Sequence, residues 1–99
     1  MSTIKISDEA MPEFQAGNGT VGETAAQLFD STFAVHKHVV VHADDANSGT
    51  ISIGNSAARA SSGFILKAGD TSPPIYIDDL SKIWLIGSAA SQNFSWLCC

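Results

Sequence analysis

Short runs in which apolar and polar residues alternate recur along most of the chain, with turn residues between them. The clearest run spans residues 34–43, where Val35, Val39 and Val41 would share one face of an extended chain. Similar runs follow at a spacing of about 8–12 residues, and no long run shows a helical period. This pattern predicts an all-β domain of about seven to eight short strands. The predicted strands cover residues 23–29, 34–43, 50–54, 64–66, 75–77, 82–86 and 93–98. The alanines in residues 23–29 would also allow a helical turn there.

Two packed sheets would bury one face of each strand, so we expect a small β-sandwich or jelly roll. The pattern does not separate a jelly roll from other Greek-key sandwiches. Phe94, Trp96 and Cys98 share one face of the last run, which indicates core packing. Residues 75–77 follow two prolines, which suit an edge strand, and residues 55–63 are predicted to form an irregular loop.

Residues 1–22 differ from the sandwich domain predicted for residues 23–99. Residues 3–7 alternate like one short strand, and residues 17–22 resemble a glycine-rich linker. We therefore expect an extended N-terminal arm, which can add a strand to the sheet edge of a neighbouring protein. The residues of this arm that we expect to make contacts are Thr3, Ile4, Lys5, Ile6, Met11 and Phe14.

The composition is apolar and thinly charged, with 44% hydrophobic residues, 15% charged residues and a net charge of −5. Ordinary soluble domains have about 25% charged residues, so either a partner covers part of this surface or the chain is simply rich in Ser, Thr and Gly. The five basic residues are scattered, which argues against a nucleic-acid partner. The apolar runs are too short for a membrane span or a signal peptide, so we expect no membrane association and folding in a cytosol.

Residue types that carry catalytic or cofactor chemistry do not form a convincing site in this sequence. Residues 17–22 match the G-x-G-x-x-G of dinucleotide-binding folds, but no strand precedes them and the rest of the chain cannot build a βαβ unit. No nucleophile elbow is present. The adjacent Cys98 and Cys99 are expected to be free thiols, one of them packed inward. We therefore expect neither an enzyme nor a cofactor.

Three histidines, His36, His38 and His42, would share one face of the run at residues 34–43. Two of them could hold one metal ion, but a third ligand cannot be placed, so no metal site is expected. The acidic residues in turns fit backbone capping better than calcium binding. We expect the histidines, together with Trp84 on a later strand, to face another subunit, where histidines gathered by a symmetry axis would make the contact pH-sensitive.

About two-thirds of the chain follows one particular order of strands and turns. A strand at residues 39–43 leads to an Asn-Ser-Gly turn at residues 47–49, and the next strand ends at Gly54. A Gly-Phe-Ile-Leu run at residues 63–66 precedes an Ala-Gly-Asp turn, and Asp-Leu-Ser-Lys at residues 79–82 leads into the penultimate strand. This order resembles small bacteriophage virion proteins of the capsid cement, or decoration, type.

The resemblance implies a homotrimeric β-sandwich or jelly roll on the outer surface of a phage head, where it binds the major capsid protein and clamps neighbouring capsid subunits. Such a protein would be a virion component assembled in the host cytoplasm. Residues 1–22 fall outside the resemblance, and they are where attachment would be decided. The alternative is a tail, baseplate or head-fibre module that binds a host-surface glycan.

Overall fold

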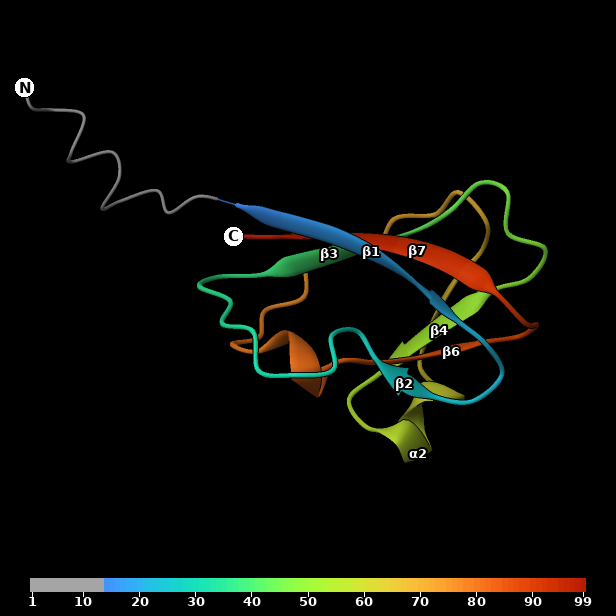
Figure 1. Cartoon of the computed structure of the whole chain (residues 1–99), viewed down its shortest axis with the longest axis horizontal. Helices are drawn as coiled ribbons and strands as arrows, with labels where there is room; N and C mark the ends of the chain where they lie inside the picture. Colours follow the sequence, from blue (N-terminus) through green and yellow to red (C-terminus); the bar gives the residue numbers. More distant parts are fainter. Residues whose placement is uncertain (1–13) are drawn as a thin grey trace, which may run out of the picture.

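The computed structural model describes residues 14–99, and in them seven strands form two antiparallel sheets (Figure 1). One sheet has the strand order β1-β7-β3 and the other has the order β2-β6-β4-β5. The predicted all-β sandwich is therefore confirmed. The elements are β1 (Gln15–Val21), β2 (Ala26–Gln27), β3 (Val39–Ala43), β4 (Ile51–Gly54), α2 (Ala57–Ala60), β5 (Phe64–Leu66), the 3-10 helix η1 (Leu80–Lys82), β6 (Trp84–Gly87) and β7 (Gln92–Cys98).

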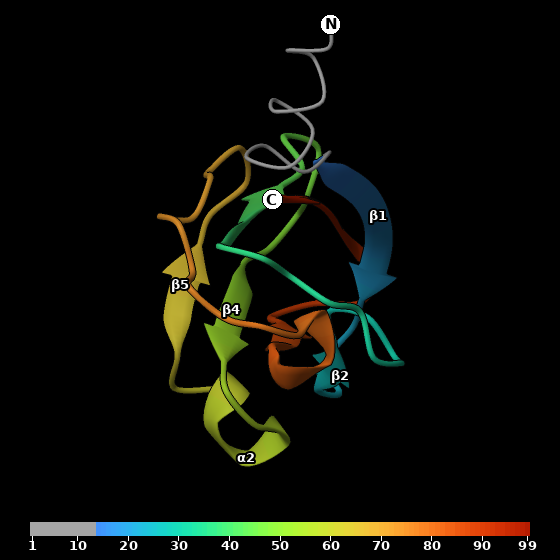
Figure 2. The ribbon, with the colours of Figure 1, turned by 90° about the vertical axis from the view of Figure 1, so that its left-hand side faces the viewer.

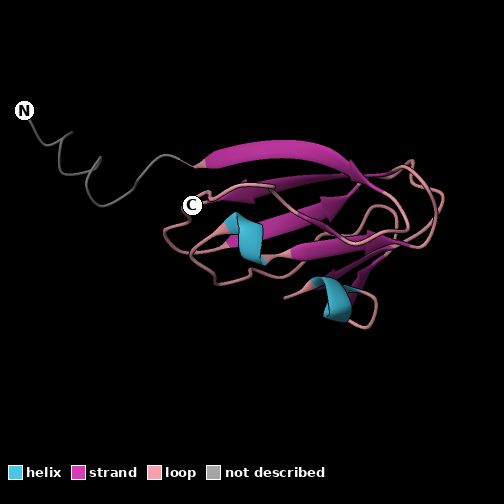
Figure 3. Ribbon diagram, turned by 60° about the horizontal axis from the view of Figure 1, so that its bottom comes forward, coloured by secondary structure: helices cyan, strands magenta, loops and turns pink. Residues whose placement is uncertain are grey.

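The hydrophobic core lies between the inner faces of the two sheets, which are stacked as layers in Figure 3. Alternation along β3 buries Val39 and Val41 completely, with 0% of each exposed. Along β7 it buries Phe94, Trp96 and Cys98, as their shared face in the sequence predicted. The other buried members of this core are Val21, Leu28, Val35, Ala43, Ile51, Ile53, Leu66, Leu80, Ile83 and Leu85.

The glycine-rich stretch at residues 17–22, predicted to be a linker, belongs to the sandwich. Residues Gln15–Val21 form β1, which pairs antiparallel with β7 along its whole length. β1 is an edge strand, since β7 is its neighbour on one side and no other strand of the described chain flanks it. The prediction that all of residues 1–22 form an arm outside the sandwich is therefore wrong for residues 15–21.

Aromatic rings of β7 explain why this edge strand is built from glycine. A Cβ atom on Gly17 would lie 2.5 Å from the ring of Trp96, and one on Gly19 would lie 2.7 Å from the ring of Phe94. The two rings lie across the backbone of β1 and supply the apolar cover that side chains of β1 would otherwise provide. Because β1 itself carries no apolar alternation, its sequence resembles a linker.

Other predicted boundaries also change. The run at residues 34–43 is a strand only from Val39 onward, because the chain bends at residues 36–37. The strand predicted at residues 23–29 is reduced to the two residues of β2. Residues 55–63, predicted to be an irregular loop, contain the one-turn helix α2. These differences lie at strand ends and connections, and they leave the two-sheet architecture unchanged.

The two sheets have unequal widths, which leaves one side of the sandwich incomplete. Beside β3, where a fourth strand would lie, runs the irregular segment 71–77. Ile75 bridges to Val39 there, but Pro73 and Pro74 have no N–H group to continue a ladder. The edge strand predicted at this place is therefore only an isolated bridge. We refer to the side between segment 71–77 and β5, on the left in Figure 2, as the open side.

Candidate functional site

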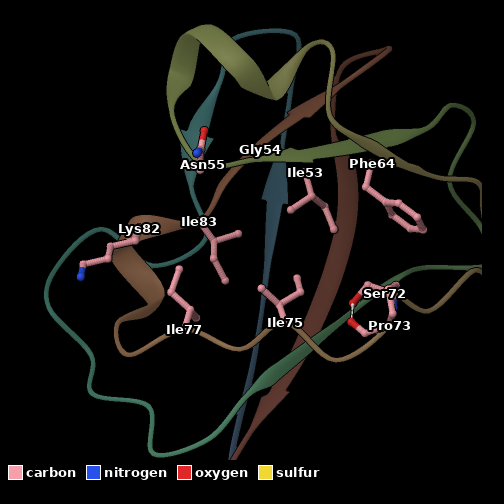
Figure 4. A pocket seen from close by; sticks show the side chains of 10 residues that line it. All are labelled: Ile53, Gly54, Asn55, Phe64, Ser72, Pro73, Ile75, Ile77, Lys82 and Ile83. Atoms are coloured by element: carbon pink, nitrogen blue, oxygen red, sulfur yellow. Dashed lines mark hydrogen bonds between the residues drawn. The ribbon is translucent and has the colours of Figure 1, made fainter.

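An apolar groove of about 270 Å³ lies between the two sheets on the open side (Figure 4). In it, Ile75 and Ile77 of segment 71–77 point toward Ile53 of β4 and toward Ile83, the residue between η1 and β6. The ammonium group of Lys82 points away from this apolar centre. The residues that line the groove are Ile53, Gly54, Asn55, Phe64, Ser72, Pro73, Ile75, Ile77, Lys82 and Ile83.

Phe64 shows how the groove arises from the unequal sheets. It pairs with Ile53 across the β4–β5 ladder, so its side chain lies on the inner face of its sheet. A residue on an inner face is normally buried, yet Phe64 is 53% exposed. The irregular segment on the other sheet does not cover it. The groove is therefore a part of the sandwich interior that the described chain leaves open.

Three of the lining side chains are polar, those of Asn55, Ser72 and Lys82, and the hydroxyl of Ser72 is already bonded. The hydroxyl of Ser72 accepts a hydrogen bond from the backbone N–H of Val41 at 2.9 Å and donates one to the carbonyl oxygen of Pro73 at 2.9 Å. A water molecule held in a cavity needs about two to four polar partners, and these walls offer few. The groove is therefore suited to an apolar group.

One end of the groove is held by the turn that leads into η1. Asp79 caps η1: its Oδ1 accepts hydrogen bonds from the backbone N–H groups of Phe33 at 3.1 Å and Ser81 at 2.9 Å. The bond to Phe33 N–H, followed by those to Ser81, lowers the pKa of the Asp79 carboxyl. Beside it, the Lys82 ammonium lies 2.8 Å from Asp78 Oδ1 on the exposed surface. These contacts position Lys82 and the lining residue Ile83 next to it.

The three predicted subunit-contact histidines lie along the outside of β3 and the chain that precedes it. The Nδ1 atom of His42 is 2.8 Å from Thr71 Oγ1, and its Nε2 atom is 4.0 Å from Asp45 Oδ1. The ring of His38 packs edge-to-face on Tyr76 at 5.7 Å. His36 lies in the bend before β3 and is exposed. Two of the histidines therefore contact segment 71–77.

Trp84 does not join the histidines. It is half-buried on β6, where its neighbour Leu85 points into the core, so Trp84 faces outward from the second sheet. His42 alternates with Val41 on β3 and faces outward from the first sheet. The two outward faces lie on opposite sides of the sandwich, so one flat subunit contact would not contain both residues.

Most of the predicted arm contacts, namely Thr3, Ile4, Lys5, Ile6 and Met11, lie outside the described residues. Phe14 is described: it directly precedes β1 and is 65% exposed. An aromatic side chain with this exposure makes little contribution to the core of its own subunit.

Acidic turn residues act as caps in the structure. Asp44 Oδ2 accepts from the backbone N–H of Ala46 at 3.1 Å, and Asp70 Oδ2 accepts from that of Lys67 at 3.0 Å. Among residues 14–99, no group of three or more His, Cys, Asp or Glu side chains is arranged to hold a metal ion. No helix in this part of the chain has the length and apolarity to cross a membrane.

Cys98 and Cys99 are free thiols in the structure, and Cys98 is the one packed inward. Burial raises the pKa of the Cys98 thiol. A raised pKa reduces the thiolate fraction at neutral pH, so Cys98 is a core residue with low nucleophilic reactivity.

The groove was not predicted from the sequence, although several of its residues stand out there. Ile75 and Ile77 lie on either side of Tyr76 in the sequence, as in an alternating strand, and the two prolines before them indicated an edge strand. The sequence carries no signal that segment 71–77 would lie across from Phe64 and leave a gap. That gap depends on which strands share a sheet, and strand pairing is a long-range property.

Comparison with known proteins identifies no family. No family model matches the chain, and no curated protein matches it. Among solved structures, the chain is similar to the crystal structure of PirA, with 14% sequence identity over 84% of this chain and 91% of that chain, and a TM-score of 0.41. A similarity this low assigns no function.

Proposed function

We propose that the protein is a capsid decoration protein, a homotrimer that binds the outer surface of a phage head and clamps neighbouring major capsid subunits. The order of turns described for the sequence supports this proposal, and so does the position of the N-terminal segment. Residues 1–14 lead directly into the edge strand β1, and the one described candidate contact among them, Phe14, is exposed. That position is the observation that carries the proposal.

Strand β1 makes the segment before it suited to attachment. Seven residue pairs with β7 fix β1 in its sheet, so residues 1–13 precede an ordered edge strand in the sequence. An extended segment tethered to a rigid edge can add to a sheet of a neighbour through main-chain hydrogen bonds. A clamp that binds only the assembled shell stabilises that shell by mass action. The role needs no catalytic group and no cofactor.

The copy number of this chain in purified virions tests the location. Quantitative mass spectrometry against the major capsid protein should give a ratio near one to one, because a clamp at each lattice position needs many copies. A handful of copies per particle would overturn the decoration role and favour the alternative, a tail or fibre module that binds glycan. Trp96 is buried in the core, so the exposed Tyr76 would then be the aromatic to examine.

A further inference from the structure

We propose that the groove on the open side binds residues 3–7 of a neighbouring copy of this chain, with Ile4 and Ile6 placed among the groove isoleucines. The docking does not rest on the virion role proposed above, but the number of copies in the resulting ring does. Three features support the docking: the chemistry of the groove, the sequence of the segment, and the positions of the groove and of β1 on the sandwich.

The groove requires an occupant whose alternate residues are aliphatic. Its centre is formed by Ile53, Ile75, Ile77 and Ile83, and the one hydroxyl in its wall is already bonded. β5 beside it is the edge strand of its sheet, so main-chain groups there are available for one more strand. An extended chain could therefore pair with β5 and direct every second side chain into the groove.

Residues 3–7 have the pattern that such a site selects. Their sequence is Thr-Ile-Lys-Ile-Ser, so Ile4 and Ile6 would share one face and Thr3, Lys5 and Ser7 the other. Side chains two residues apart on a strand are separated by about 7 Å, so Ile4 and Ile6 could each contact different isoleucines of the groove. The polar residues of the segment would then face water.

The positions of the groove and of β1 favour a neighbouring copy over the same chain. β1 is one edge of its sheet, and segment 71–77 is attached to the opposite edge, next to β3 (Figure 2). To reach its own groove, the N-terminal segment would have to pass the ends of β7 and β3, where Lys37 N–H is bonded to the Cys99 carbonyl at 2.7 Å. A donor on one side and an acceptor on the other give a head-to-tail contact, which can close into a ring. Three copies would make the proposed homotrimer.

Sedimentation velocity on the full-length chain tests this arrangement. The wild type should be an oligomer, and the double variant Ile4→Asp/Ile6→Asp should be a monomer, because aspartates cannot enter an apolar groove. The matched control, Thr3→Asp/Ser7→Asp, adds the same charge on the opposite face and should remain an oligomer. A monomeric wild type, or an Ile4→Asp/Ile6→Asp variant that still assembles, would overturn the proposal.

A complementation experiment separates head-to-tail docking from every other oligomer. The groove variant Ile77→Asp should also be a monomer, whereas Tyr76→Asp, which changes the outward-facing neighbour, should assemble. Circular dichroism first establishes that each variant is folded. The Ile77→Asp chain keeps its segment and the Ile4→Asp/Ile6→Asp chain keeps its groove, so mixing them should give a one-to-one heterodimer. A mixture that stays monomeric contradicts the inference, whatever the virion copy number shows.

Discussion

Close contacts between single residues decide how the edge strand β1 is built. The rings of Trp96 and Phe94 occupy the space where side chains of Gly17 and Gly19 would lie. Trp96 also packs edge-to-face against Phe33 with ring centroids 5.4 Å apart, so it cannot easily move away. The glycines and the aromatic rings therefore form one packing unit, so a substitution at a glycine should displace the ring that packs on it.

This packing unit predicts that alanine substitutions at Gly17 and Gly22 will affect the stability of the fold differently. Gly17→Ala should destabilise the fold by about 1–3 kcal/mol, the usual cost of overpacking a core. Gly22→Ala is the matched control, because no atom lies within 4 Å of its added Cβ, and it should be neutral or slightly stabilising. Urea unfolding followed by tryptophan fluorescence measures both. Equal effects at the two sites would contradict the proposed ring contact.

Asp79 predicts a pH dependence of stability. The pKa of Asp79 is lowered in the folded state, first by the hydrogen bond from the Phe33 N–H group. The ionised carboxylate therefore adds to the free energy of unfolding at pH values above the ordinary aspartate pKa of about 3.9. That contribution is lost as the pH falls through the lower folded-state value. Asp79→Asn should lower the melting temperature at pH 7 and flatten its fall below about pH 4. The exposed Asp30 gives the control: Asp30→Asn should leave the acid limb unchanged. An equally steep acid limb in Asp79→Asn would refute the capping role.

Among the elements, strands with one face on the core and one face in water could be predicted from their alternating sequence. A strand whose apolar contacts come from the side chains of another strand could not. Val39–Ala43 and Gln92–Cys98 alternate because one side of each faces the core, and both were predicted. Gln15–Val21 was missed because its cover comes from rings on β7. Residues 75–77 were predicted to form a strand, but only Ile75 bridges to Val39, because Pro73 and Pro74 precede the bridge and the partner chain bends at residues 36–37. The groove between two sheets could not be predicted, since it depends on pairings distant in sequence.

Gln92 connects two loops at one end of the sandwich. Its side chain is 1% exposed, accepts from Gly49 N–H at 2.8 Å, and donates to Ser48 Oγ at 3.2 Å and to the Ala90 carbonyl at 2.9 Å. Gln92→Leu would leave partners of this amide unpaired, which should cost about 1–3 kcal/mol. The exposed Gln15 allows the same change at little cost. Chemical denaturation compares the two, and equal stability of the variants would show that the amide does not hold the loops.

In the whole molecule, the two regions proposed for assembly lie on different sides of the sandwich. Strand β1, which follows residues 1–14 in the sequence, is one edge of its sheet, and the apolar groove lies on the open side beyond β3. If residues 3–7 bind the next copy as proposed, Met11 and Phe14 are the predicted contacts that remain for the shell. One short chain could in this way join its own copies and bind a lattice.

Substitution of Phe14 tests attachment to the shell independently of assembly between copies of this chain. Because Phe14 is 65% exposed, Phe14→Asp should leave both folding and oligomer size unchanged. Its affinity for the shell should fall about tenfold or more, a loss of about 1.4 kcal/mol or more, while Phe14→Leu keeps most of the apolar contact. Co-sedimentation with phage heads lacking the protein measures binding. Wild-type affinity in Phe14→Asp would remove this residue from the contact.

The clamp itself is tested most directly by how well heads retain their DNA on heating. Virions prepared without this chain should release DNA at a lower temperature than complete virions, and adding back the purified full-length protein should restore the higher temperature. This outcome is expected because a ligand that binds only the assembled shell raises the free energy needed to open it. Release at the same temperature with and without the protein would contradict the clamp.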